Sequence, residues 1–235
     1  MSNIAIILSG GTGTRMGLDT PKQYILINDC PILHYSIKTF LHNDKISKII
    51  ICCAKEWIGF INEHLESINT KKDILFSIPG ETRQITIYNA LKKLEGVAND
   101  DDIVIIHDGA RPLVSQGLIN DCLDGCKKHD GILPVIRMKD TIYLSEDGCK
   151  INSLLNRSHL YAGQAPEAFQ YKKYYDIHKS MSHEELLKIN GSSEIAYKCG
   201  LDISMIAGDE MNFKITTMED LESFKTIINN KKLLL

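Results

Sequence analysis

The sequence has no long hydrophobic run. None of its apolar segments approaches the roughly 20 residues that a membrane-spanning helix needs, so we expect no membrane partner. The first eight residues, Met-Ser-Asn-Ile-Ala-Ile-Ile-Leu, have no basic leader and no cleavage site, which argues against a signal peptide. A basic excess is also lacking, because 27 Lys and Arg stand against 30 Asp and Glu, a net charge of −3. This balance argues against general nucleic-acid binding.

Paired cysteines are lacking as well. The seven cysteines are odd in number and form no Cys-x-x-Cys motif. In a chain of 235 residues without a signal sequence, this pattern predicts free thiols in a reducing compartment, and we therefore expect a cytoplasmic protein.

Short isoleucine-rich runs alternate with amphipathic segments over the first 135 residues. The runs have the unbroken apolar character of strands that are buried on both faces. This β-α-β-α order predicts an α/β, Rossmann-like fold whose mostly parallel sheet carries helices on both faces. The predicted strands span residues 4–8, 48–53, 74–78, 103–106 and 131–136, and the predicted helices span 32–42, 57–68, 84–94 and about 119–126.

The alternation stops after residue 136. Two extended runs flank a Ser145–Gly148 turn, and an Asp-Gly pair in such a turn is a strong hairpin signal. A hairpin inserted in an α/β domain should project from it, so we expect an arm at about 139–157. Helices at 171–180 and 183–189, a strand at 203–206 and a last helix from about 218 complete a single domain, 1–235. Thr217 and Asp220 resemble a capping box at the start of that last helix.

A glycine-rich segment follows the first predicted strand. Ser9 to Gly17 contains four glycines and Arg15, and Lys22 follows closely. No Gly-Lys-[Ser/Thr] follows, which excludes a Walker A loop, and Met16 stands where a dinucleotide fingerprint needs its third glycine. Two fixed cations beside bare backbone N–H groups suit a triphosphate. The alternative is a glycine-rich turn with two solvated surface cations.

A second polar segment, His107 to Pro112, follows the strand at 103–106. Ligands bind at the carboxyl ends of the strands in open α/β sheets. A carboxylate facing a phosphate loop would repel the ligand unless a cation lay between them, so Asp108 is a candidate Mg²⁺ ligand. Arg111 can reach an anionic substrate, and His107 is expected to be packed and hydrogen-bonded rather than catalytic.

Six motifs occur in the order found in one enzyme family. The sequence resembles the family that contains 2-C-methyl-D-erythritol 4-phosphate cytidylyltransferase and ribitol-5-phosphate cytidylyltransferase, over essentially the whole chain. The motifs are Gly10-Gly-Thr-Gly-Thr-Arg-Met-Gly17 with Pro21-Lys-Gln23, Gly80-x-x-Arg83 with Thr86, His107-Asp-x-Ala-Arg-Pro112, Asp140-Thr141, Gln164-Ala-Pro166, and Asn212-Phe-Lys-Ile-Thr-Thr217 with Asp220-Leu221.

The resemblance implies transfer of CMP from CTP to a polyol phosphate, with Mg²⁺ as cofactor and release of pyrophosphate. It implies that Arg15, Lys22 and Lys214 are catalytic and that Asp108 holds the metal. The hairpin would be a dimerisation arm that brings Thr141 and Arg157 into the neighbouring subunit's site. The implied nucleotide-binding residues are Leu8, Ser9, Gly10, Gly11, Gly13, Gly80, Glu81, Arg83 and Thr86, and the implied acceptor-binding residues are Arg111, Thr141, Arg157 and Ala165.

The chemistry agrees with the residues taken alone. An acceptor phosphate is already anionic near neutral pH, so it can attack the α-phosphorus without a strong general base. The site must then supply alignment and charge neutralisation, which arginine and lysine side chains provide. Two other classes compete with this interpretation: a nicotinamide oxidoreductase, disfavoured by the missing third glycine, and a silent binding module, disfavoured by the joint presence of these cations.

The identity of the acceptor depends on smaller differences. Residues 156–164 resemble the ribitol-phosphate branch, and we expect ribitol 5-phosphate in preference to methylerythritol 4-phosphate. The family's Thr-Pro-Gln is Ala165-Pro166-Glu167 here, and the methylerythritol branch's Thr-Asp-Asp or Thr-Asp-Glu is Ser192-Ser193-Glu194. Ala165 lacks a hydroxyl for the acceptor, and Glu167 is expected to add an anion near an anionic ligand. These departures leave a different polyol phosphate open as the acceptor.

Overall fold

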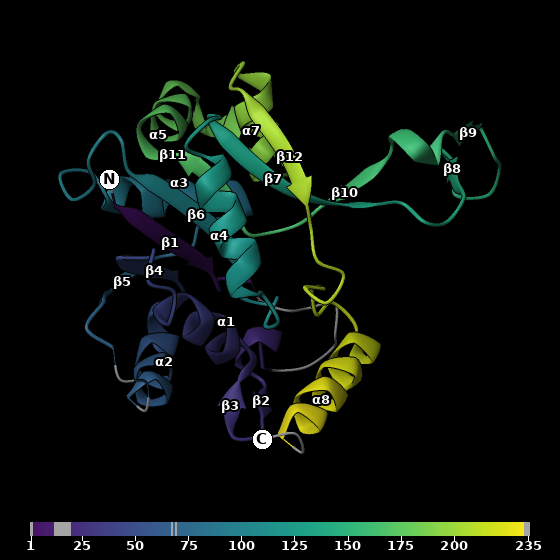
Figure 1. The fold of residues 1–235 in the computed structure, drawn as a ribbon. Helices are drawn as coiled ribbons and strands as arrows, with labels where there is room; N and C mark the ends of the chain where they lie inside the picture. The colour runs from purple at the N-terminus through teal and green to yellow at the C-terminus, as the bar shows by residue number, and fades with distance from the viewer. Residues whose placement is uncertain (1, 12–19, 67, 69, 233–235) are drawn as a thin grey trace.

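A mixed sheet of eight strands forms the centre of the molecule (Figure 1). The computed structural model describes residues 2–11, 20–66, 68 and 70–232. Six strands run parallel and two short ones run against them, which confirms the predicted α/β fold. The parallel strands are β1 (Asn3–Leu8), β4 (Lys48–Cys52), β5 (Asp73–Ser77), β6 (Ile103–Asp108), β7 (Gly131–Arg137) and β12 (Ile203–Ala207), and the antiparallel ones are β10 (Tyr161–Gly163) and β11 (Glu167–Gln170).

The order of the strands places the ends of β1 and β6 at the middle of the sheet. β1 pairs with β4 on one side and with β6 on the other, and β5 lies outside β4. β11 inserts between β6 and β7, β10 continues along β7, and β12 closes the far edge. The sequence analysis did not predict β10 and β11.

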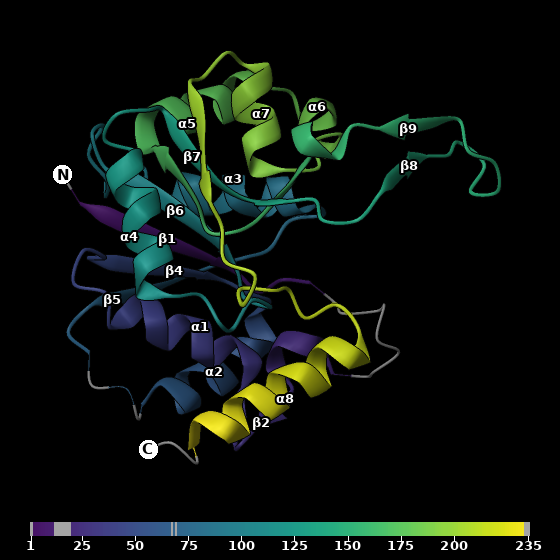
Figure 2. The same ribbon diagram turned by 45° about the vertical axis from the view of Figure 1, so that its right-hand side comes forward.

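Helices cover both faces of the sheet, as predicted (Figure 2). Alternate side chains of β1 point to opposite faces, so Ala5 and Ile7 join one apolar cluster while Ile4 and Ile6 join the other. The first cluster packs against α1 (Ile32–Leu41), α2 (Ile58–Leu65) and α4 (Gln116–Gly125). The second packs against α3 (Arg83–Lys93), α5 (Tyr171–Ser180), α6 (His183–Leu187) and α7 (Ser192–Lys198).

A third, smaller cluster joins the last helix to the segment after the glycine-rich loop. α8 (Met218–Lys232) contributes Leu221 and Phe224, which pack with Ile27 and Ile32 beside the β2 (Leu26–Ile27) and β3 (Cys30–Pro31) hairpin. The predicted capping box is present, because the Asp220 carboxylate accepts from the Thr217 N–H and the Thr217 hydroxyl accepts from the Asp220 N–H. Single 3₁₀ turns occur at η2 (Lys22–Tyr24), η3 (Lys55–Trp57) and η4 (Arg157–His159).

A hairpin arm projects from the sheet, as predicted (Figures 1 and 2). Its strands, β8 (Ile142–Leu144) and β9 (Ser153–Leu155), pair antiparallel. The Asp147 carboxylate accepts from the backbone N–H groups of Cys149 and Lys150, and Gly148 has a φ of +73°, so the turn chemistry is the one that an Asp-Gly pair supplies.

Two further expectations concern composition. None of the helices in the described part of the chain is long and apolar enough to cross a membrane. All seven cysteines lie among the described residues and are free thiols.

Candidate active site

A cavity of about 470 Å³ opens where β1 and β6 end. It gathers residues from five separate segments of the chain, and most of them are the ones that the sequence motifs singled out. The cavity is lined by Leu8, Ser9, Gly10, Gly11, Lys22, Gln23, Gly80, Glu81, Thr82, Arg83, Thr86, Asp108, Ala110 and Lys214.

The start of the glycine-rich loop is held by the segment that carries Lys22. The side-chain amide of Gln23 donates to the backbone carbonyls of Ser9, at 2.8 Å, and Gly11, at 2.7 Å. The Tyr24 hydroxyl donates to the Ser9 carbonyl and accepts from the Ser9 hydroxyl, each at 2.9 Å. Burial raises the pKa of Tyr24 to about 12, so this hydroxyl keeps its proton. Gln23 and Tyr24 therefore fix the loop beside Lys22.

The opposite wall is a tight turn before α3. The Thr82 hydroxyl caps the helix by accepting from the Ile85 N–H, and the Thr86 hydroxyl accepts from the Gly80 N–H at 2.9 Å. The two walls touch, because a Cβ added at Gly10 would lie 2.3 Å from the Cβ of Pro79. Only glycine allows this approach at position 10.

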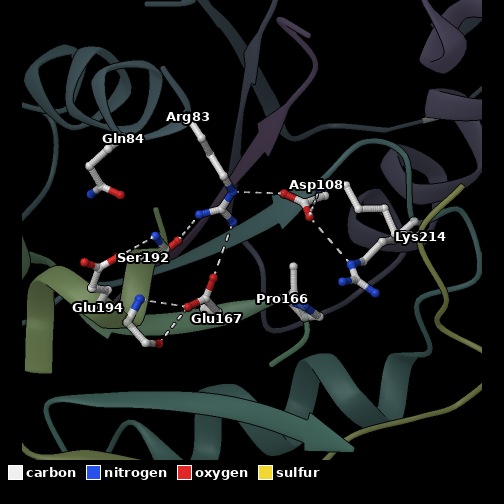
Figure 3. Close-up of polar contacts among 12 residues, drawn as sticks. Arg83, Gln84, Asp108, Pro166, Glu167, Ser192, Glu194 and Lys214 are labelled. Carbon is white, nitrogen blue, oxygen red and sulfur yellow. Dashed lines mark hydrogen bonds and ion pairs between the residues drawn. The ribbon is translucent and has the colours of Figure 1, made fainter. Parts of the chain in front are cut away.

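Three cations surround the carboxylate of Asp108 at the end of β6 (Figure 3). Arg83 Nε lies 3.2 Å from Oδ1, while Lys214 Nζ lies 2.9 Å and Arg111 Nε 3.6 Å from Oδ2. The Arg111 guanidinium also donates to the Asn212 carbonyl at 2.8 Å, which ties it to the Asn212–Thr217 segment. The cluster combines cations from three parts of the sequence on one anion.

The cations determine the charge state of Asp108. Burial alone would raise its pKa, but the charges of Arg83, Lys214 and Arg111 outweigh burial and hold the pKa well below its usual range. His107 is fully buried, and one ring nitrogen lies 3.0 Å from the Arg111 carbonyl. Burial lowers the pKa of His107 to about 4, so it is neutral and packed, as predicted.

The same geometry tests the residues for a metal. Among the described residues, no group of three or more His, Cys, Asp or Glu side chains could hold an ion. Magnesium is often held by one or two carboxylates together with substrate phosphates, and Asp108 fits that limited role. Both of its oxygens already contact cations, so a metal at Asp108 requires at least one of them to move away. The assignment of Asp108 to Mg²⁺ stays a prediction.

Some predicted residues lie outside the cavity. Gly13 and Arg15 fall outside the described residues. Thr141 and Arg157 lie on the arm, where they line a separate hollow of about 410 Å³ with Leu154, Leu155 and Asn156. Ala165 is buried, and its carbonyl accepts from the Asn212 side chain at 2.7 Å. Arg111 reaches the site through Asp108.

The carboxylate of Glu167 differs from its expected surroundings. It is buried and is not among the residues that line the cavity. Its Oε1 lies 3.3 Å from Arg83 Nη2, which balances its charge. Sequence reasoning also missed the supporting contacts of Gln23 and Tyr24; the signal was their position next to Lys22 in the Pro-Lys-Gln motif.

Cationic side chains line a cavity at the carboxyl ends of β1 and β6, where ligands bind in α/β sheets, and this arrangement is typical of a nucleotidyltransferase. The family model for IspD, 2-C-methyl-D-erythritol 4-phosphate cytidylyltransferase, matches residues 3–230, and the chain belongs to this family of cytidylyltransferases.

Relatives of this chain include proteins named for two different acceptors. It is 38% identical over 227 residues to the 2-C-methyl-D-erythritol 4-phosphate cytidylyltransferase of Clostridium beijerinckii, covering 96% of this chain and 98% of the relative. It is 33% identical to the ribitol-5-phosphate cytidylyltransferase of Streptococcus pneumoniae strain D39, covering 94% and 97%. The fold matches the crystal structure of 4-diphosphocytidyl-2C-methyl-D-erythritol synthase from Anaerococcus prevotii, with a TM-score of 0.81, 24% identity and coverage of 97% and 96%.

Proposed function

We propose that this cytidylyltransferase transfers CMP from CTP to a polyol phosphate, D-ribitol 5-phosphate, in the cavity at the ends of β1 and β6, giving CDP-ribitol and pyrophosphate. The observation that carries the proposal is the convergence of Lys22, Arg83 and Lys214 on one cavity, with Asp108 at its floor. The glycine-rich wall offers the CTP phosphates backbone N–H groups beside Lys22. The Gly80–Thr86 wall is the proposed cytosine site.

The transfer itself needs little proton chemistry. The acceptor phosphate attacks the α-phosphorus in line, and the bond to the β-phosphate oxygen breaks to release pyrophosphate. We assign Lys214 to the charge on the α-phosphate and Lys22 to the charge on the leaving group, because both side chains line the cavity. His107 is neutral and fully buried, and one of its ring nitrogens contacts the backbone carbonyl of Arg111. We therefore assign it no role as a general base. Bound Mg²⁺ would neutralise triphosphate charge, with Asp108 as its protein ligand.

The choice of acceptor rests on the sequence of residues 156–164, which resembles the ribitol-phosphate branch. Methylerythritol 4-phosphate is the second candidate, and the 38% identity to the Clostridium beijerinckii protein favours it. The steady-state kcat/KM for both acceptors at saturating CTP, measured by pyrophosphate release, separates the two. We expect ribitol 5-phosphate to be the better substrate, because a site built to hydrogen-bond extra hydroxyls discriminates against an acceptor that leaves those groups unpaired. A clear preference for methylerythritol 4-phosphate overturns the assignment of the branch and leaves cytidylyl transfer intact.

The arm supports a homodimer as the working form. Tyr143, Ile151 and Leu154 are 55%, 68% and 65% exposed on it, and apolar side chains in a projecting hairpin need cover. A second copy of the chain supplies that cover and places Thr141 and Arg157 at the neighbouring cavity. We place the enzyme in the cytoplasm, where CTP is available and free thiols persist.

A further inference from the structure

Glu167 lies directly behind the candidate active site, at the first residue of β11. Its two carboxylate oxygens have different partners. Oε1 lies 3.3 Å from Arg83 Nη2, and Oε2 accepts from the backbone N–H of Ser193, at 3.0 Å, and from its hydroxyl, at 2.6 Å (Figure 3). This carboxylate therefore joins the first turn of α7 to a cation of the cavity wall.

Arg83 is held between two carboxylates. Its Nε faces Asp108, its Nη2 faces Glu167, and its Nη1 donates to the hydroxyl of Ser192. Glu167 thus pairs with Nη2 of the guanidinium, and Asp108 contacts the guanidinium through Oδ1 alone. The other oxygen of Asp108 is left to Lys214 and Arg111.

We propose that Glu167 is a positioning residue for the transfer: it acts through Arg83 to keep Asp108 shared, and so holds Lys214 at the floor of the cavity. The inference rests on the proposed function. Without Glu167, Asp108 is the one carboxylate left in contact with Arg83, within the described network, and the guanidinium competes with Lys214 for both of its oxygens. Lys214 then loses its fixed position, and a small displacement of a group that aligns a reaction is costly.

The contact between Glu167 and Ser193 offers a second position for the carboxylate. Glu167 Oε2 accepts from both the N–H and the hydroxyl of Ser193, so the two side chains lie directly against each other. A glutamine at 167 with an aspartate at 193 would again bring one carboxylate and one neutral partner to this contact. If one negative charge beside Arg83 is what matters, we expect it to act from β11 or from α7.

The first experiment compares Glu167→Gln with Glu194→Gln. Glu194 is a matched control, because it lies on the same turn of α7 but contacts Asn190, Gly191 and Lys198 instead of Arg83. We expect Glu167→Gln to lower kcat about 10-fold or more and to change the KM for CTP less than about 3-fold. Glu194→Gln should keep both constants within about 2-fold of the wild type. Equal kcat values for Glu167→Gln and the wild type contradict the inference.

The second experiment moves the charge. Ser193→Asp in the native chain sets two carboxylates against each other and should lower both kcat and the melting temperature Tm. The same substitution in the Glu167→Gln chain returns a single carboxylate to the contact, so it should restore kcat to within about 3-fold of the wild type and raise Tm. The effect of Ser193→Asp on kcat and Tm thus changes sign between the two backgrounds. An effect of the same sign in both shows that Glu167 is only a packing residue.

An Arg83→Met background tests whether Glu167 acts through Arg83. There, Glu167→Gln should cause no further loss of kcat, whereas additive losses contradict the route through Arg83. The outcome stays distinct from that of the proposed function. If the wild type transfers CMP to no polyol phosphate, the proposed function fails, and the sign reversal of Ser193→Asp in Tm still decides whether Arg83 needs one exchangeable carboxylate.

Discussion

Lys22 is the residue whose removal tests the nucleotide half of the site. Its side chain is buried and lines the cavity next to the loop that Gln23 and Tyr24 hold in place. We expect Lys22→Ala to lower kcat/KM on the order of 100-fold, the scale for losing one preorganised charge. Lys225→Ala, which removes only a surface ion pair on α8, is the control and should stay within about 2-fold. Wild-type turnover in Lys22→Ala contradicts the loop assignment.

Asp108 has a structural role in the cationic cluster and a proposed role in binding Mg²⁺, and each has its own test. Asp108→Asn leaves Arg83, Lys214 and Arg111 around a neutral amide, so we expect it to lower the free energy of unfolding by about 3 kcal/mol, as when one partner of a buried ion pair is removed. Urea unfolding measures this change. In the wild type, EDTA should abolish turnover and added Mg²⁺ should restore it. Turnover that survives EDTA removes the case for a metal at Asp108, whatever the stability result.

At the scale of elements, Gly10 lies at a point where the two walls of the cavity pack closely against each other. A methyl group at position 10 would meet Pro79 at 2.3 Å, whereas one at Gly11 meets nothing within 4 Å. We expect Gly10→Ala to lower the free energy of unfolding by about 1–3 kcal/mol because the walls must separate. Gly11→Ala is the matched control for stability and should stay within about 0.5 kcal/mol. Equal stabilities for the two variants mean that the walls give way freely.

The arm is the second element with a direct test. If it carries Arg157 into the neighbouring site, a chain with Arg157→Ala and a chain with Lys22→Ala complement each other. Mixed heterodimers then contain one site with neither substitution, and we expect activity to return to a substantial fraction of the wild type. Sedimentation at micromolar concentration should show a dimer. A monomer, or a mixture with no more activity than its parts, contradicts the shared site.

The elements that the sequence predicts are those with a clear period. The hydrophobic pattern alone predicts strands β1, β4 and β6 from their isoleucine runs, and helices α1 and α3 from their apolar stripes. β11 and α7 do not, because β11 has only four residues and α7 buries only Ser192, Ile195 and Ala196. Glu167 and Ser193 lie on these two elements, so their contact was beyond prediction.

The same limit applies within the site. Sequence motifs identified Asp108 and Lys214 as candidate functional residues. They are 106 positions apart in the sequence, and motif spacing alone does not predict which charged side chains form ion pairs. Asp108 was predicted to face a metal, which stays a prediction, and the three cationic side chains that the fold places on it were not predicted. The burial of Asp108 and its ion pairs follow from the topology of the sheet, which brings the carboxyl end of β6 next to the Asn212–Thr217 segment.

For the whole molecule, two fully buried histidines contribute to the response to acid. Burial lowers the pKa of both His107 and His178 to about 4, below the usual value of about 6.5. The unfolded chain therefore binds more protons between pH 6.5 and 4, and stability falls as the pH falls through that range. We expect each histidine to cost on the order of 2 kcal/mol at pH 5 relative to pH 7.5. Urea midpoints should shift accordingly, and His178→Phe should reduce the shift by about the contribution of one histidine. An unchanged shift in that variant contradicts the assignment.

The central claim is that this cavity joins CMP to a polyol phosphate, and ³¹P NMR of the reaction tests it most directly. With CTP, Mg²⁺ and ribitol 5-phosphate, the account predicts loss of the CTP signals and growth of the two diphosphate signals of a CDP-polyol, together with free pyrophosphate. Lys22→Ala should form this product far more slowly. Release of orthophosphate and CDP in place of pyrophosphate, or no consumption of CTP with any polyol phosphate, would contradict the account.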